Sequence, residues 1–262
     1  MSDSGRRSAL CVALATTALT ATACAAPPPA PRAAPEAALR VCTTGDYKPA
    51  TYRDPRTGRY GGIDIEMARS LGAYLKREVT FVPTTWPTLM KDLATKGKCE
   101  ITMGGVSITP ERRKSADFTR PYLNAGKIPL NTTARAPHLR TLDQIDRKGV
   151  RVIVNPGGTN EEFVKKHFSK ATVVAWPDNV TIFDQLLAGK ADVMITDALE
   201  AEYQAELHPG LTAVNPDKPF NEDQKAYMLP KGSRLTVKAD QWLEQALKDG
   251  TFQRFYTTWM NH

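Results

Sequence analysis

Two carboxylates stand three residues apart in the segment VMITDALE. Asp197 ends an apolar run, and Glu200 comes about one helical turn later. Acids in the first turn of a helix are stabilised by the helix dipole and, in solvent, need no other role. An acid enclosed in a cleft differs, because desolvation raises its pKa and can keep it protonated near neutral pH. The pair therefore indicates a solvated helix start, a cradle for an amine, or an acid that donates a proton.

A Gly-Gly turn followed by hydroxyls and an arginine, in GGVSITPERR, is a second candidate site. Gly104–Gly105 lets a backbone approach a ligand closely, and Ser107 offers a hydroxyl. Arg112 adds a planar fork that matches a carboxylate. The same segment suits a plain helix start, with Thr109 as the N-cap and a proline at the first helical position. Both interpretations stay open, since one segment can serve both purposes.

A third candidate, VNPGGTNEEF, follows an apolar strand and opens a helix at Thr159 and Asn160. Free N–H groups at the positive end of a helix dipole form an anion site. The segment lacks the Lys-Ser/Thr of a nucleotide P-loop, and GxGxxG does not occur in the chain, so a nucleotide is a poor ligand. A bare capping turn is the alternative.

Three isolated side chains complete the set of candidates. Trp86 in TTWPTL and Tyr47 in GDYKP have rings that can stack on a ligand, and Lys127 in NAGKIP has a charge that can pair with an anion. Each also has an ordinary interpretation, because aromatic rings commonly pack in cores and lysines are mostly solvated. None of the three is specific on its own.

The elements that must position these residues alternate between helix and strand. Amphipathic helices, visible in the spacing of Phe183, Leu186 and Leu187, alternate with short apolar strands, which favours parallel α/β units. The predicted strands are 39–44, 79–84, 100–105, 150–155, 172–176 and 192–196. The order helix, Gly-Lys, acid, strand and turn occurs twice, in TLMKDLATKGKCEITMGGVSIT and IFDQLLAGKADVMITDALE, which suggests two similar lobes. Ligands of open α/β sheets bind beyond the carboxyl ends of strands, in the segments that carry the candidates.

The N-terminal residues predict export. Residues 1–23 combine two arginines, an apolar run too short for a bilayer and an A-x-A site, which is the pattern of a signal peptide. Cys24 follows directly, but soluble export is favoured over a lipid anchor at Cys24, because Ala21 stands where a lipobox usually has Leu. Residues 24–38 form a Pro/Ala-rich tether that cannot build a core. We therefore expect a periplasmic protein, and no later segment is apolar over the length of a membrane span.

The charge, the histidine spacing and the cysteine positions indicate which ligands the protein can bind and whether its cysteines are bridged. The formal net charge is +7, which suits an anionic small molecule, whereas the bases are too scattered for nucleic acid. The histidines show no metal-ligand spacing. Export permits a disulfide. Cys42 and Cys99, however, lie in or beside predicted strands, where buried free thiols are common, so unbridged cysteines are favoured.

Longer motifs carry a family resemblance across nearly all of residues 39–259. GGIDIEMA, SITPERR, PGGTNE, GKADVMITD, AYMLPKG and DGTFQRFYTTW resemble the periplasmic amino-acid-binding proteins of ABC importers. More narrowly, VCTTGDYKP, FVPTTWPTLMKDL, MGGVSIT, PDNVTIFDQL and NPDKPF resemble the cyclohexadienyl dehydratases, which are periplasmic enzymes built on the binding-protein fold.

The resemblance implies a fold of the α/β class. It is a two-lobed type II periplasmic-binding-protein fold with an interlobe cleft and two crossing strands, one near 127–132 and one near 225–229. Lobe 1 is expected to comprise residues 39–128 plus 226–262, and lobe 2 residues 129–225. The oligomeric state stays open, with a homo-oligomer as one outcome.

The resemblance to the binding proteins also implies residue roles. Arg112 takes the position of the arginine that binds the ligand carboxylate, and Thr159 falls at the carboxylate site of the second lobe. Asp197 takes the position of the acid that binds the ligand amine. Trp86 and Tyr47 stand at aromatic wall positions.

The dehydratases add Asn160 and Lys127 as pocket residues and Glu200 as a proton donor. The implied reaction is the decarboxylating dehydration of prephenate to phenylpyruvate and of arogenate to phenylalanine, without a metal or cofactor. Binding proteins usually carry a Ser/Thr pair where Gly104–Gly105 stands, so the glycines make room and argue against a small α-amino acid. The rival function is a non-catalytic binding protein for an amino acid or aromatic acid that serves an ABC importer. Both functions share the fold, so the acid at 200 has to discriminate between them.

Overall fold

The structure is a computed structural model that describes residues 37–261. The predicted signal peptide, residues 1–23, and the predicted tether up to residue 36 lie outside the described residues. Two five-stranded sheets form the framework of the described chain.

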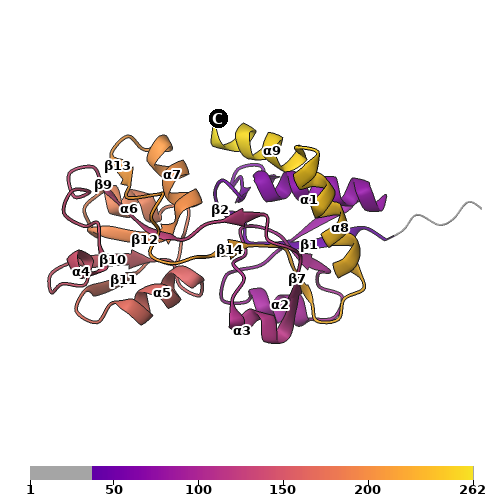
Figure 1. Ribbon diagram of the computed structural model, residues 1–262, viewed down its shortest axis with the longest axis horizontal. Helices are drawn as coiled ribbons and strands as arrows, with labels where there is room; N and C mark the ends of the chain where they lie inside the picture. Colours follow the sequence, from indigo (N-terminus) through magenta and orange to yellow (C-terminus); the bar gives the residue numbers. More distant parts are fainter. Residues whose placement is uncertain (1–36, 262) are drawn as a thin grey trace, which may run out of the picture. The chain divides into compact units, whose positions relative to one another are not determined.

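The first sheet has the strand order β5-β1-β6-β15-β7 (Figure 1). Its strands are β1 (Leu39–Thr43), β5 (Val79–Pro83), β6 (Ile101–Thr102), β7 (Ala116–Phe118) and β15 (Met228–Pro230). β1 pairs in parallel with β5 and β6, whereas β15 pairs antiparallel with β6 and β7. The strands predicted at 39–44, 79–84 and 100–105 are therefore present, and the last is shorter than predicted.

Apolar helix faces bury this sheet. The helices are α1 (Ile63–Leu75), α2 (Leu89–Ala94), α3 (Pro110–Ser115), α8 (Leu235–Lys248) and α9 (Thr251–Met260). Trp242 of α8 and Phe252 of α9 share one buried core with Val41 of β1 and with Met67 and Leu71 of α1. The last two helices therefore pack on α1, next to the first strand of the chain (Figure 1).

The second sheet has the strand order β11-β10-β12-β9-β13. Its strands are β9 (Lys127–Thr132), β10 (Arg151–Val154), β11 (Thr172–Ala175), β12 (Val193–Asp197) and β13 (Leu211–Ala213). Its helices are α4 (Leu142–Ile145), α5 (Thr159–His167), α6 (Ile182–Leu187) and α7 (Ala198–Leu207). β12 is buried at every position because helices cover both its faces, and it runs parallel to β10 and antiparallel to β9.

Two short sheets complete the described chain. β2 (Asp46–Tyr47), β3 (Thr51–Arg53) and β4 (Tyr60–Gly61) form an antiparallel meander after β1. β8 (Leu123–Asn124) and β14 (Gln224–Lys225) pair antiparallel where the chain leaves the first sheet and returns to it. The first crossing thus comes earlier than predicted, because residues 127–132 are themselves a strand of the second sheet. We propose lobe limits of 39–126 plus 226–262 and of 127–225, which move the expected limit from 128 to the start of β9.

The two internal cysteines form a disulfide, so the prediction of free thiols is wrong. Cys42 lies on β1, and Cys99 lies two residues before the start of β6, the parallel neighbour of β1. Their Cα atoms are 5.6 Å apart, which is within the range that a disulfide spans. The sequence separation of 57 residues hid this proximity, since strand order is not visible in a local pattern.

No helix within residues 37–261 is long and apolar enough to cross a membrane.

Candidate active site

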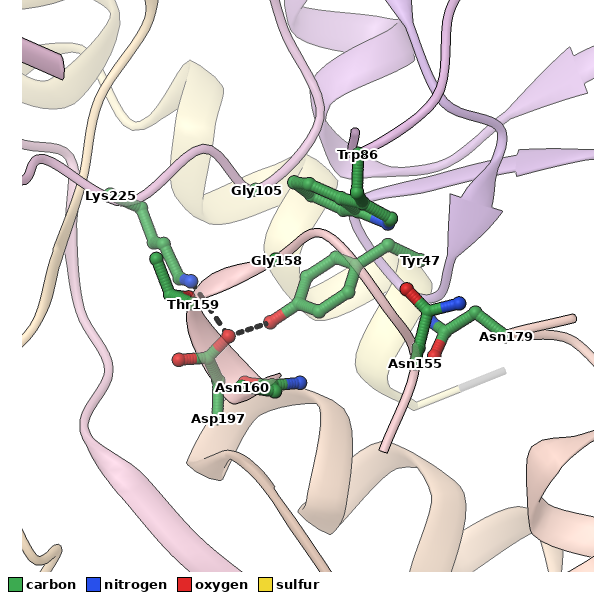
Figure 2. Close-up of a pocket in the computed structure, with 10 residues that line it drawn as sticks. All are labelled: Tyr47, Trp86, Gly105, Asn155, Gly158, Thr159, Asn160, Asn179, Asp197 and Lys225. Carbon is green, nitrogen blue, oxygen red and sulfur yellow. Dashed lines mark hydrogen bonds and ion pairs between the residues drawn. The ribbon is translucent and has the colours of Figure 1, made fainter. Parts of the chain in front are cut away.

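A cavity forms where segments that follow strands of both sheets meet the β2 meander (Figure 2). The lining residues are Tyr47, Trp86, Gly105, Asn155, Gly158, Thr159, Asn160, Asn179, Asp197 and Lys225. Of the residues predicted to form the site, Tyr47, Trp86, Thr159, Asn160 and Asp197 line this cavity. They come from four separate segments of the sequence, so the fold itself assembles the site.

The cavity is narrow in this conformation. The cavity volume is about 20 Å³. That is about the room that one water needs. A ligand with a ring therefore requires the cavity to widen.

Asp197 ends β12 and is the centre of a buried ion cluster. Its Oδ1 is 2.8 Å from Nζ of Lys127, and its Oδ2 is 2.7 Å from Nζ of Lys225. The Tyr47 hydroxyl donates to the same Oδ2 at 2.8 Å (Figure 2). Burial alone would raise the pKa of Asp197, but the two ammonium groups outweigh burial and hold the pKa well below its usual value. Asp197 is therefore ionised.

The two lysines tie this cluster to the walls of the cavity. Lys127, on β9, also donates to Oγ1 of Thr159 at 2.9 Å and to Oδ1 of Asn160 at 2.6 Å. Lys225, on β14, donates to Oγ of Ser107 at 2.8 Å. Each lysine is about 1% exposed, and burial lowers the pKa of Lys225 while Asp197 opposes that shift. The predicted pocket residue Lys127 thus contacts two cavity-lining residues, Thr159 and Asn160, at the start of α5.

Glu200 lies in α7, the helix that follows β12, and has neutral partners. It is fully buried in the first turn of α7. Asn179 Nδ2 donates to its Oε1 at 3.2 Å, and the Thr196 hydroxyl contacts its Oε2. Burial raises the pKa of Glu200 to about 8, and the negative charge of Asp197 adds to that rise. Glu200 is therefore protonated at neutral pH, and its partner Asn179 lines the cavity.

Arg112 is held by hydrogen bonds within its own segment. It is 8% exposed, and its Nη1 donates to the Ser107 carbonyl at 2.9 Å. Thr109 Oγ1 accepts from the Arg112 backbone N–H at 3.1 Å, so the helix-start interpretation holds for this segment. Arg112 does not line the cavity that contains Asp197, and within residues 37–261 no carboxylate forms an ion pair with it. Ser107 links Arg112 to Lys225, because its hydroxyl accepts from the lysine.

Tyr47 and Trp86 form an aromatic wall of the cavity, and the Tyr47 ring leaves no room for a side chain at Gly105. The Tyr47 and Trp86 rings meet edge to face with centroids 5.8 Å apart, and Trp86 Nε1 donates to Oδ1 of Asp46 at 3.1 Å. Gly105 has a φ of +71°, and a Cβ there would lie 2.5 Å from the Tyr47 ring. The room that the glycines were predicted to leave is thus filled by Tyr47.

Sequence reasoning missed two residues of this site. Lys225 lies in a polar stretch before a strand, and Asn179 lies in a loop, so neither carried a signal of its own. Behind the cavity wall, Asp64 is fully buried and accepts from the Gly105 N–H at 2.6 Å and from the hydroxyls of Tyr122 and Tyr227. Asp64 therefore holds the glycine turn in place.

Comparison with known proteins places this geometry in a family. Residues 39–262 match the bacterial extracellular solute-binding proteins, family 3. Cyclohexadienyl dehydratase of Pseudomonas aeruginosa is 46% identical over 224 residues, which cover 86% of this chain and 83% of that protein. The L-cystine-binding protein TcyJ of Escherichia coli is 28% identical and covers 84% of this chain and 82% of its own.

Two solved structures give the same result. An ancestral amino acid-binding protein, described as a precursor of cyclohexadienyl dehydratase, has a TM-score of 0.78 at 36% identity and covers 85% of this chain and 95% of its own. An ancestral cyclohexadienyl dehydratase has a TM-score of 0.53 at 51% identity and covers 86% and 93%. These matches confirm the predicted type II periplasmic-binding-protein fold and the resemblance to cyclohexadienyl dehydratase. The chain belongs to family 3 of the bacterial extracellular solute-binding proteins.

Proposed function

We propose that this protein is a dehydratase that removes water and carbon dioxide from prephenate to give phenylpyruvate, and from arogenate to give phenylalanine. Glu200 is the general acid. The observation that carries the proposal is the burial of Glu200 among neutral groups beside the cavity, which raises its pKa to about 8. The identity to a cyclohexadienyl dehydratase supports the reaction type.

The reaction needs a proton at one oxygen. Protonation of the C4 hydroxyl lets water leave as its C–O bond breaks. The electron pair of the bond to the ring carboxylate moves into the ring as carbon dioxide departs, and the ring becomes aromatic. Solvent then restores the proton to Glu200. A general acid contributes about 10²–10⁴-fold to such a step, and positioning in a closed cavity contributes further.

The walls of the cavity suit a ring that carries carboxylates. Tyr47 and Trp86 offer ring faces and edges, and Thr159 and Asn160 lie at the N-terminus of α5, where anions are favoured. Lys225 brings a positive charge to the wall. These groups can hold a substrate without covalent chemistry.

Arg112 is the proposed anchor for a substrate carboxylate. It is buried and lacks an ion pair within the described chain, and a buried cation gains most from an anionic partner. Ser107 contacts both Arg112 and Lys225. We propose that the cavity widens toward Ser107 when substrate binds, which brings Arg112 to its edge.

The alternative function is a non-catalytic binding protein for an amino acid or aromatic acid. It is favoured by the family as a whole and by relatives whose names describe binding of amino acids. A binding protein has no use for a neutral carboxyl group beside its ligand. The environment of Glu200 therefore favours the dehydratase.

The test is direct conversion of substrate. Purified protein is incubated with prephenate and with arogenate, and phenylpyruvate and phenylalanine are quantified by absorbance and chromatography against a protein-free control. We expect both products, with a rate that falls as pH rises through about 8, because the acid must be protonated. Tight binding of an amino acid without turnover of either substrate would support the binding protein instead.

We further propose that the protein is exported to the periplasm. The family is described as extracellular, and residues 1–23 have the pattern of a signal peptide. Intact-mass analysis of periplasmic protein is expected to show a chain that starts at Cys24 or Ala25, with an added lipid mass if Cys24 is the anchor. A chain that retains residues 1–23 in that fraction would contradict export with cleavage.

A further inference from the structure

We propose that Lys225 occupies the ammonium position of the site from within the protein, so that the site prefers a 2-oxo acid to the corresponding 2-amino acid. The inference rests on the proposed function and concerns its substrate: prephenate is favoured over arogenate. The two substrates differ at this group alone, as a carbonyl in one and a charged ammonium in the other. Discrimination between them must therefore come from whatever faces this group.

Asp197 is the residue that would receive a substrate ammonium, and its oxygens are already engaged. Lys127 occupies Oδ1, and Lys225 and the Tyr47 hydroxyl share Oδ2. An ionised carboxylate has about four acceptor positions, so three of them are filled. Asp197 is only 2% exposed. A third ammonium group would therefore have to displace one of the two lysines.

Charge in the surrounding region opposes such a ligand as well. The buried ammonium groups of Lys127 and Lys225 already pair with Asp197, and Asp223 lies 3.5 Å from Nζ of Lys127. A substrate ammonium at Asp197 would meet these two like charges at close range, whereas the carbonyl of a 2-oxo acid carries no positive charge.

Lys225 is the lysine that sets the preference, because it lines the cavity and Lys127 does not. Its backbone bridges to Ser107, and its Nζ is fixed between Ser107 and Asp197. Loss of this ammonium would free Oδ2 of Asp197 toward the cavity. It would also remove one cation that repels an incoming ammonium.

The variant Lys225→Met keeps a long side chain and removes the charge. Lys225→Arg keeps the charge, and Lys231→Met removes an exposed lysine that pairs with Asp117 outside the cluster. Calorimetry measures binding of phenylpyruvate and L-phenylalanine, which differ only in the oxo and amino groups. The ratio of kcat/KM for prephenate and arogenate is measured on the same proteins.

We expect wild type, Lys225→Arg and Lys231→Met to bind phenylpyruvate about tenfold or more tightly than L-phenylalanine, and Lys225→Met to lose about tenfold of that preference. The kcat/KM ratio should shift in the same direction. Equal binding of the two acids by wild type, binding of neither, or an unchanged ratio in folded Lys225→Met would overturn the inference. Product binding needs no turnover, so the preference can hold even if the proposed reaction fails.

Discussion

The surroundings of Asp197 and of Glu200 differ although the two acids belong to one stretch of chain and are equally buried. Asp197, at the end of β12, faces two ammonium groups and a phenol. Glu200, in the first turn of α7, faces an amide and a hydroxyl. The cations lower the pKa of the first acid, and their absence leaves burial to raise the pKa of the second. The neighbours of a buried acid, and not its burial, decide whether it is charged.

The comparison predicts that removing the charged acid destabilises the protein most. Asp197→Ala leaves two buried ammonium groups without their counter-ion, and breaking a buried ion pair costs about 3–5 kcal/mol of unfolding free energy. Urea unfolding at pH 7 measures the loss. Asp117→Ala, which removes the partner of the exposed Lys231, is the control, and surface pairs contribute about 0–1 kcal/mol. Equal losses in the two variants would contradict the account of the ion cluster.

Neutralising Glu200 should stabilise the protein, whereas removing Asp197 should destabilise it. The folded-state pKa of Glu200 is raised to about 8 from the ordinary value of 4.5 for a glutamate, so the folded protein holds a proton that the unfolded chain has lost between these pH values. Stability therefore falls as pH rises through this window and then levels off. Glu200→Gln is neutral throughout, so it should be more stable than wild type by on the order of 1–3 kcal/mol at pH 8, with the gain absent near pH 4. Urea unfolding at both pH values tests this.

A matched substitution on the same helix serves as the control for that result. Glu206 lies on the same helix with its side chain exposed, so Glu206→Gln should show little of the pH-dependent gain. A destabilised Glu200→Gln at pH 8 would mean that Glu200 is ionised in the folded protein, and the contrast with Asp197 would fail.

The smallest expected effect concerns the phenol that contacts Asp197. Tyr47→Phe removes one donor from Oδ2 and leaves both lysines in place. The loss of a hydrogen bond to a charged group is expected to cost about 1–2 kcal/mol of unfolding free energy. Urea unfolding at pH 7 measures it, with Tyr52→Phe in the same meander as the control. A loss as large as that of Asp197→Ala would mean that the phenol, and not the two lysines, is the main group that stabilises the ionised Asp197.

Local pattern predicted much of the fold because alternation and turn chemistry are properties of short segments. The strand before Asp197 and the helix that opens at Thr159 were both predicted from apolar runs and a glycine turn. Candidate residues such as Asn160 followed from the rule that ligands lie beyond strand ends. The resemblance to a known family supplied the roles that periodicity could not.

The missing parts depend on long-range contacts. Cys42 and Cys99 are bridged because β1 and β6 are neighbours, and no local pattern reports strand order. Lys225 reaches Asp197 from the second crossing of the chain. The hydrogen bond from Arg112 to the Ser107 carbonyl is likewise a tertiary contact that the motif alone does not specify. Enclosure, which decides the state of Glu200, is also a property of the assembled fold.

The role of Glu200 as the acid is tested most directly by single-turnover kinetics of Glu200→Gln at saturating prephenate. Glutamine preserves volume and hydrogen bonding but has no proton to transfer. We expect the rate to fall by about 10²-fold or more relative to wild type, while calorimetric binding of phenylpyruvate stays within a few-fold of wild type and Glu206→Gln turns over normally. A Glu200→Gln protein that converts prephenate at nearly the wild-type rate would contradict the assignment of Glu200 as the general acid.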